Sequence, residues 1–200
     1  DRFLRGDLMR TAIFASGSGS NFEVLAQKFQ AGEFKAELVL LFSDHPDAFV
    51  IKRAQKLKVP YETFTVKECG DKVSYEKRIM ETLKKYRIDF IILAGYMRVL
   101  GEKIVLAYDK RIVNLHPAYL PEYQGLHAIE RAFSDHQTQG KSQTGVTIHY
   151  VDTGLDTGPA ILQKHVPIYP DDTLETLEQR IHACEHELYP QALKQIFKGE

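Results

Sequence analysis

The sequence predicts an α/β fold: an open, doubly wound and mostly parallel sheet, with an antiparallel strand pair and a closing helix at its C-terminal end. Three observations support this fold class. Short apolar runs alternate with amphipathic segments through the first part of the chain. Residues 90–94 are almost wholly apolar, as in a strand whose two faces are both covered. From residue 144 onward, extended runs replace this alternation.

The first part of the chain is expected to alternate strands and helices. Residues 11–15 form the first predicted strand, and a Gly/Ser turn follows it. The spacing of Phe22, Leu25 and Phe29 then predicts a helix over residues 21–30. The same periodicities predict strands at residues 38–42, 61–64, 90–94 and 112–114, and helices at residues 48–57, 74–86 and 102–108.

The C-terminal part is expected to be antiparallel. Residues 144–151 alternate in polarity, residues 160–168 form a second extended run, and the two can pair across the loop at residues 153–158. Residues 174–196 are predicted to form the closing helix, locally disturbed at Pro190.

The predicted domain organisation is a single domain over residues 9–200. Residues 1–8 are charged and lack clear periodicity. We expect Met9 to be the natural start, with residues 1–8 a head that is disordered or foreign to the natural protein.

Composition excludes several classes of protein. The chain has 200 residues, 44% of them apolar, and a net charge of −1, which favours a globular domain over a disordered chain or a nucleic-acid-binding surface. No apolar stretch approaches the roughly 20 residues of a membrane helix. Only Cys69 and Cys184 are present and no signal peptide is recognisable, so a reducing, cytoplasmic location is expected.

A candidate catalytic set lies at the end of the predicted strand 112–114. Asn114 and His116 are two residues apart, so their side chains are expected to point to the same face, and Pro117 ends the strand. A later loop at residues 152–159 supplies carboxylates. An amide donor beside an imidazole and a carboxylate suits a reaction that forms an oxyanion and moves a proton.

The turn at residues 16–21 is a candidate phosphate site. It does not match a dinucleotide fingerprint, because Phe22 stands where a third glycine is required, and no Gly-Lys-Ser/Thr follows to bind a triphosphate. Glycines and a helix start suit a monophosphate, although an ordinary strand-to-helix turn would have the same composition.

Other candidate residues have ordinary structural interpretations. His182 and His186 fit a His-x-x-Glu-His zinc pattern, but such short matches arise by chance and no metal is expected. His127 could line the site or begin a helix, and His149 is expected to be a satisfied sheet residue. Cys184 has no recognisable base to activate it as a nucleophile.

Several segments together resemble a known family. These are FASGSGSNF at 14–22, LAGYMR at 93–98, NLHP at 114–117, VTIHYV at 146–151 and LDTGP at 155–159. In this order they resemble the phosphoribosylglycinamide formyltransferases, the folate-dependent enzymes of purine synthesis, over the chain from about Arg10 to its C-terminus. The resemblance implies a Rossmann-like formyltransferase fold.

The resemblance also implies the ligands and their sites. The formyl donor would be 10-formyltetrahydrofolate and the acceptor the amine of N1-(5-phosphoribosyl)glycinamide. Substrate binding would fall to Gly19, Ser20, Asn21 and Glu185. Folate binding would fall to Met97, Arg98, Val99, Leu100 and Asn114, and to Lys72, which could equally be a solvated lysine at a helix start.

If the resemblance holds, the catalytic roles of three residues follow from the negative charge that forms on the formyl oxygen and from the proton that must move. Asn114 would donate to the oxyanion, and His116 would transfer the proton. Asp156 would hold the imidazole of His116 and raise its pKa, whereas Asp152 is interpreted as a turn residue. No metal, nucleic acid or membrane takes part.

Alternatives remain open at this point. A formyltetrahydrofolate deformylase would use the same three residues with water as acceptor. An inactive folate- or nucleotide-binding module could share the fold. A methionyl-tRNA formyltransferase and a nicotinamide oxidoreductase fit less well, and a homodimer is neither indicated nor excluded.

Overall fold

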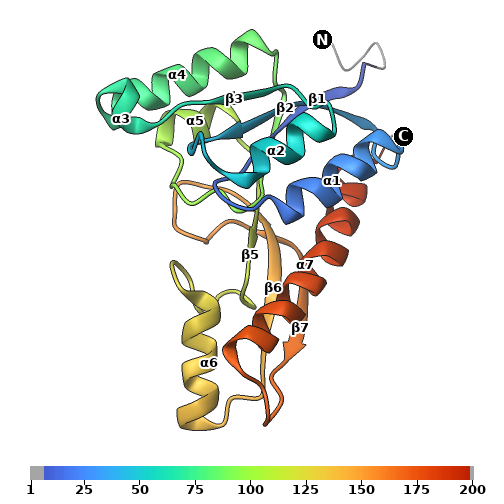
Figure 1. Cartoon of the computed structure of the whole chain (residues 1–200), viewed down its shortest axis with the longest axis vertical. Helices are drawn as coiled ribbons and strands as arrows, with labels where there is room; N and C mark the ends of the chain where they lie inside the picture. Colours follow the sequence, from blue (N-terminus) through green and yellow to red (C-terminus); the bar gives the residue numbers. More distant parts are fainter. Residues whose placement is uncertain (1–6, 199–200) are drawn as a thin grey trace.

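The computed structural model describes residues 7–198, and within this range seven strands form one sheet in the order β3-β2-β1-β4-β5-β6-β7 (Figure 1). The first five strands pair in parallel, whereas β6 pairs antiparallel with both of its neighbours. The strands are β1 (Met9–Phe14), β2 (Ala36–Ser43), β3 (Tyr61–Thr63), β4 (Phe90–Leu93), β5 (Ile112–His116), β6 (Gln143–Tyr150) and β7 (Ala160–Pro167). The predicted fold class is confirmed. Residues 1–6 of the expected head and residues 199–200 lie outside the described residues.

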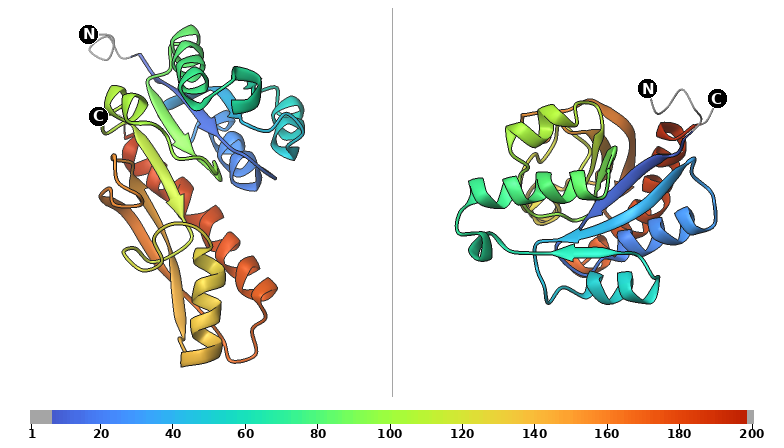
Figure 2. Two further views of the ribbon diagram at one scale, coloured as in Figure 1. Left: turned by 90° about the vertical axis from the view of Figure 1, so that its left-hand side faces the viewer. Right: turned by 90° about the horizontal axis from the view of Figure 1, so that it is seen from above.

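Helices cover both faces of this sheet (Figure 2). Two separate apolar cores show which helix covers which face. One core joins the sheet to α1 (Ser20–Gln30), α2 (Phe49–Lys56), α6 (Ala128–Gln139) and α7 (Leu174–Ile196). The other joins it to α3 (Val66–Cys69), α4 (Lys72–Lys85) and α5 (Glu102–Ala107).

The central strand β4 shows why the sheet is buried on both sides. Phe90 and Ile92 pack into the first core, and Ile91 and Leu93 pack into the second. Side chains alternate faces along a strand, so a strand between two cores must be apolar at every position. The burial of β4 between two cores explains why residues 90–93 are all apolar.

The closing helix α7 has the predicted bounds and contains Pro190. The helix continues from Leu174 to Ile196, so the proline does not end it. A proline removes one helical hydrogen bond and clashes with the preceding turn. Here Tyr189, Pro190 and Leu193 are all buried, and their packing outweighs that cost.

Two helices were not predicted. The short helix α3 holds a single turn, and its N-cap is the side chain of Thr65, which accepts from the Glu68 amide. The longer α6 has a weak apolar signal, because only Ala128, Ile129 and Ala132 are buried in it. The strand predicted at residues 112–114 also extends further, to His116.

The order of strands places a crevice at a defined point. The chain runs outward from β1 to β2 and β3, and then returns to β4 on the other side of β1. β1 and β4 are the two neighbouring strands at this reversal, and the loops that follow them run in different directions. A crevice is therefore left beyond the carboxyl ends of these two strands. The turn after β1 and the segment after β4 border this crevice.

Gly19 fixes the shape of the turn after β1, and its replacement gives a test of the fold. Its φ is +77°, and an added Cβ would lie 2.3 Å from Val50 Cγ2 and 2.9 Å from Val50 Cα. We expect Gly19→Ala to destabilise the protein by about 2 kcal/mol or more in urea unfolding, since the start of α2 would have to shift. Gly17→Ala, where nothing lies within 4 Å of the added Cβ, is the control. Equal stability of the two variants would contradict this account.

Candidate active site

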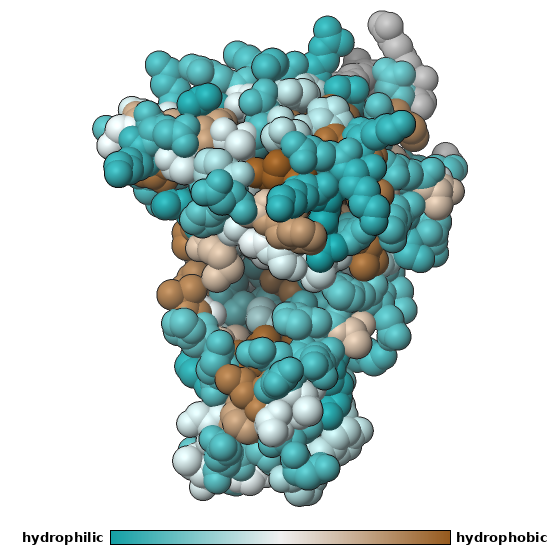
Figure 3. All heavy atoms as spheres, viewed as in Figure 1, coloured by the Kyte–Doolittle hydropathy of each residue, from teal (hydrophilic) through white to brown (hydrophobic). Residues whose placement is uncertain are grey.

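A pocket of about 750 Å³ opens at the crevice, between the parallel part of the sheet and the β5–β6–β7 part. Figure 3 shows the molecule hollowed at mid-height, with apolar side chains at the edge of the hollow. Met97, Val99, Leu126 and Leu155 line the pocket, and each is more than half exposed. Large apolar side chains left open to solvent around a cavity indicate a site for a ligand with apolar surface.

The turn after β1 forms one end of the pocket. Gly19, Ser20 and Asn21, the residues assigned to substrate binding by the resemblance, line it. Gly19 is the N-cap residue of α1, and no side chain caps the helix there. The first amides of α1 therefore have no partner within the helix and carry its positive dipole end. This end of the pocket suits a small anion.

The segment after β4 forms the opposite wall. Met97, Arg98, Val99 and Leu100, which the family resemblance assigns to folate binding, all line the pocket. This segment is held at both ends: the Met97 amide donates to Ser16 Oγ at 2.9 Å, and the Gly101 amide donates to Glu76 Oε1 at 2.9 Å. Its backbone is thus preorganised beside the cavity.

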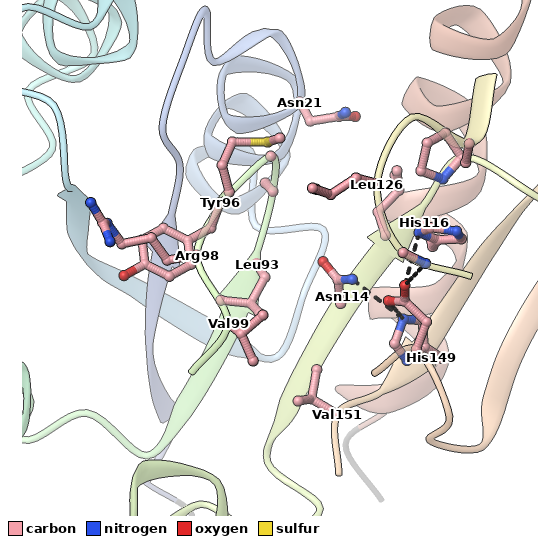
Figure 4. Close-up of a pocket in the computed structure, with 18 of the residues that line it drawn as sticks. Asn21, Leu93, Tyr96, Arg98, Val99, Asn114, His116, Leu126, His149 and Val151 are labelled. Atoms are coloured by element: carbon pink, nitrogen blue, oxygen red, sulfur yellow. Dashed lines mark hydrogen bonds and ion pairs between the residues drawn. The ribbon is translucent and has the colours of Figure 1, made fainter. Parts of the chain in front are cut away.

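Asn114, His116 and Asp156 lie together on the remaining wall. Figure 4 shows Asn114 and His116 on this wall. β5 supplies the first two, and the loop after β6 carries Asp156 back toward them. Asp156 Oδ2 lies 3.5 Å from His116 Nδ1 and accepts from the Gly125 amide at 2.8 Å. The His116 and Asp156 side chains are only 7% and 11% exposed, so water screens their interaction weakly.

His116 has a second partner, in the loop at residues 117–125. Its Nε2 lies 2.7 Å from the backbone oxygen of Tyr123. A carbonyl oxygen only accepts, so Nε2 carries the hydrogen in this contact. Both ring nitrogens of His116 therefore face a protein acceptor in this arrangement.

His149 belongs to the same cluster, which the sequence interpretation missed. It lies opposite Asn114 in the β5–β6 pairing, its Nδ1 is 2.9 Å from the Tyr150 oxygen, and its Nε2 is 3.3 Å from Asn114 Nδ2. Burial lowers the pKa of His149, which favours the neutral ring. Nδ1 then donates to Tyr150, Nε2 accepts from Asn114, and the amide of Asn114 is oriented. Only knowledge of the strand register would have revealed this pairing.

The zinc-like segment on α7 packs instead against the start of α1, at one end of the pocket. Glu185 is buried, and its Oε1 lies 2.8 Å from His182 Nδ1 and 3.3 Å from Asn21 Nδ2. His186 Nε2 contacts Ser20 Oγ at 3.3 Å. The two histidines thus have separate partners, and within residues 7–198 no group of three or more His, Cys, Asp or Glu side chains could hold a metal ion.

Of the other residues singled out from the sequence, some line the pocket and others do not. His127 lines the pocket and is also the N-cap residue of α6, so both of its interpretations hold. Asp152 accepts from the Gly154 amide and from Thr157 Oγ1, as a turn residue does. Lys72 is exposed at the start of α4 and does not line the pocket. Burial raises the pKa of the Cys184 thiol, which argues against a nucleophile there.

None of the helices described between residues 7 and 198 combines the length and apolar character needed to cross a bilayer.

The electrostatics of His182 are open to a direct test. The hydrogen bond to Glu185 raises the pKa of His182 above its ordinary 6.5. This pairing therefore stabilises the folded state below about pH 6.5, and the stabilisation is lost as pH rises through the raised pKa. We expect Glu185→Gln to lower the pKa of His182 in an NMR titration of its ring protons. Glu187→Gln, an exposed acid on the same helix, is the control. An unchanged titration in Glu185→Gln would show that Glu185 is not the cause.

Comparisons with known proteins agree with this geometry. A family model described as formyl transferase matches residues 9–193. The phosphoribosylglycinamide formyltransferase of Bacillus subtilis is 42% identical, over 94% of this chain and 95% of that protein. The trifunctional purine biosynthetic protein adenosine-3 of Drosophila melanogaster is 38% identical, over 95% of this chain but 14% of that protein.

Solved structures of the same kind of enzyme also match this chain over nearly its whole length. The glycinamide ribonucleotide transformylase 1 of Geobacillus kaustophilus superposes with a TM-score of 0.90 at 46% identity, covering 96% of this chain and all of that one (100%). The phosphoribosylglycinamide formyltransferase of Bacillus halodurans gives a TM-score of 0.88 at 47% identity, covering 94% of each chain. This chain therefore belongs to the formyltransferase family, among the phosphoribosylglycinamide formyltransferases of purine biosynthesis.

Proposed function

We propose that this enzyme transfers the formyl group of 10-formyltetrahydrofolate to the amine of N1-(5-phosphoribosyl)glycinamide. The observation that carries the proposal is the meeting of Asn114, His116 and Asp156 between two differently built ends of one pocket. At one end the backbone amides at the start of α1 face the pocket. At the other end lie the backbone of residues 97–100, which is held in place by hydrogen bonds, and apolar side chains. A reaction between a phosphorylated amine and a bulky ring system needs both.

The ribonucleotide is proposed to bind at the start of α1. Its phosphate would accept hydrogen bonds from the amides of Ser20 and Asn21, where the helix dipole favours negative charge. Glu185 lies beside this position through its contact with Asn21 and offers a carboxylate to the hydroxyl or amine donors of the substrate. The amine would then extend along the pocket toward Asn114.

The folate is proposed to bind at the opposite end. Its heterocycle would use the backbone groups of residues 97–100, and its apolar surface would pack on Val99, Leu126 and Leu155. Lys72 is proposed, from the family resemblance alone, to meet the outer part of the folate from its position at the start of α4. This arrangement directs the formyl group toward Asn114 and His116.

The chemistry is a direct transfer. A bond forms between the amine nitrogen and the formyl carbon, and the bond from that carbon to N10 of the folate breaks. The amine loses one proton and N10 gains one. In between, the formyl oxygen would carry negative charge and the Asn114 amide would donate to it. The contact of Asn114 with His149, which orients that amide, supports this role.

His116 is proposed to move the proton, with Asp156 orienting its ring from the Nδ1 side. The negative carboxylate also offsets the positive charge on the ring while it holds the proton. In the structure Nε2 donates to the Tyr123 oxygen. We therefore expect the loop at residues 117–125 to release this contact when the substrates bind.

The partners in this proposal are the two small molecules, with no metal, nucleic acid or membrane, and the location is the cytoplasm. Two free cysteines and the near-neutral net charge of −1 support it.

An assay of folate deformylation with and without the ribonucleotide tests the proposed acceptor. Absorbance reports the conversion of the formyl folate to tetrahydrofolate. We expect turnover only when the ribonucleotide is present, because the amine is the acceptor. Equal turnover in its absence would mean that water is the acceptor, as in a deformylase. Ligand binding without turnover in either case would indicate an inactive binding module.

Single substitutions test the proposed roles. We expect Asn114→Ala to lower kcat about 100- to 1,000-fold, because one donor to the oxyanion is lost. His116→Ala and Asp156→Asn should lower kcat about 100-fold or more. Asp109→Asn, an exposed acid after α5, is the matched control for Asp156→Asn. Any of the three variants with near-native kcat would remove its residue from the mechanism.

A further inference from the structure

A buried acid behind the pocket has no part in the proposed chemistry. Asp44 directly follows β2, its side chain is only 2% exposed, and it does not line the pocket. β2 neighbours β1, and β1 neighbours β4, so the carboxyl end of β2 lies beside the turn and the segment that form the two ends of the pocket. A buried carboxylate is costly unless it is hydrogen-bonded and paired, so its partners indicate what it holds.

One oxygen of Asp44 controls the orientation of Ser16. Ser16 Oγ lies 2.6 Å from Asp44 Oδ1 and accepts from the Met97 amide at 2.9 Å. A hydroxyl has one hydrogen, and a carboxylate oxygen can only accept. Donation to Asp44 therefore turns a lone pair of Ser16 toward Met97. Ser16 is itself buried, which makes water a poor substitute for either partner.

The other oxygen of Asp44 holds the next residue of the same segment. Arg98 Nε lies 3.2 Å from Asp44 Oδ2, and the guanidinium lies 5.6 Å from the centre of the Tyr75 ring. His45 Nε2 is 3.5 Å from the same oxygen, on the solvent side. The carboxylate thus reaches two consecutive residues, Met97 through Ser16 and Arg98 directly.

We propose that Asp44 is a positioning residue for the formyl donor: through Ser16 and Arg98 it sets the backbone of residues 97–100 in the orientation that binds the folate. This inference rests on the proposed function, since it takes that segment to be the folate wall. Both carboxylate oxygens act as acceptors, whereas an amide at position 44 has one acceptor oxygen and would turn its NH2 toward either Ser16 or Arg98. The phosphate end is affected less, since Gly19 and the start of α1 set the amides there.

Binding measurements with Asp44→Asn test the proposal. We expect the Kd for tetrahydrofolate, measured by calorimetry, to rise about tenfold, as for loss of one hydrogen bond to a charged group. The Kd for glycinamide ribonucleotide should change less than about threefold, since its phosphate contacts stay in place. In steady-state kinetics the KM for the formyl donor should rise while kcat changes little, because the reacting groups are untouched. Asp47→Asn, an exposed acid three residues along, is the control.

A second variant covers the case in which Asp44→Asn does not fold. Ser16→Ala removes a single buried oxygen and breaks the same connection to Met97. We expect it to weaken tetrahydrofolate binding in the same way and to speed hydrogen exchange at the Met97 amide. The double variant should be little worse than Asp44→Asn alone, since Ser16→Ala breaks a connection that Asp44→Asn already disturbs.

The outcomes separate this proposal from the proposed function. Failure of the unsubstituted enzyme to bind tetrahydrofolate would overturn the proposed function itself. Normal binding by that enzyme, with the same Kd and the same Met97 exchange in folded Ser16→Ala and Asp44→Asn, would overturn the positioning role alone. A lowered Tm with an unchanged Kd would also overturn it, because Asp44 would then act on stability only.

Discussion

The pairing of β5 with its two neighbours is the constraint on which the rest of the site depends. β4 pairs in parallel on one side, with Leu93 opposite Asn114, and β6 pairs antiparallel on the other, with His149 opposite Asn114. The first pairing sets Asn114 level with the end of β4, beside the segment that begins at Gly95. The second returns the chain after β6 to the same edge, where Asp156 reaches His116. A shift of one residue in either register would turn Asn114 and His116 to the opposite face.

This arrangement also explains why the pocket has two unlike ends. The end at α1 is made by helix geometry, which gives free amides and a positive dipole without a charged side chain. The end after β4 is made by a backbone segment whose conformation depends on buried polar partners at both of its ends. At the first end Gly19 has no space for a side chain, and at the second those partners hold the segment in place. Under the proposed function, the two ends would hold the two substrates on either side of Asn114 and His116.

Much of the fold and site could be predicted from the sequence, because the informative residues stand at strand ends. The apolar run of β4 and the strand ending at Pro117 predicted the sheet. The spacing of Asn114 and His116 predicted that they share a face. The link to Asp156 and Glu185 came from resemblance to a family, since Asp156 is far in sequence from His116 and Glu185 is far from Asn21. Lys72 was carried over in the same way and does not line the pocket.

The features that could not be predicted depend on tertiary contacts. His149 looked like an ordinary sheet residue because its meeting with Asn114 follows from the register of β5 and β6. The helix α6 was missed because its buried stripe is small. That α7 continues through Pro190 depends on the burial of the helix, which outweighs the local cost of a proline. The contact of Asp44 with Ser16 joins the ends of two adjacent strands and leaves no periodic signal in the sequence.

A crystal structure with glycinamide ribonucleotide and a non-transferable analogue of the formyl donor tests the central claim most directly. The account requires the phosphate on the amides of Ser20 and Asn21, and the analogue's formyl-equivalent oxygen within hydrogen-bonding distance of Asn114. It also requires His116 Nε2 to have exchanged the Tyr123 oxygen for a ligand atom. A phosphate bound elsewhere, or a donor oxygen remote from Asn114 and His116, would contradict it.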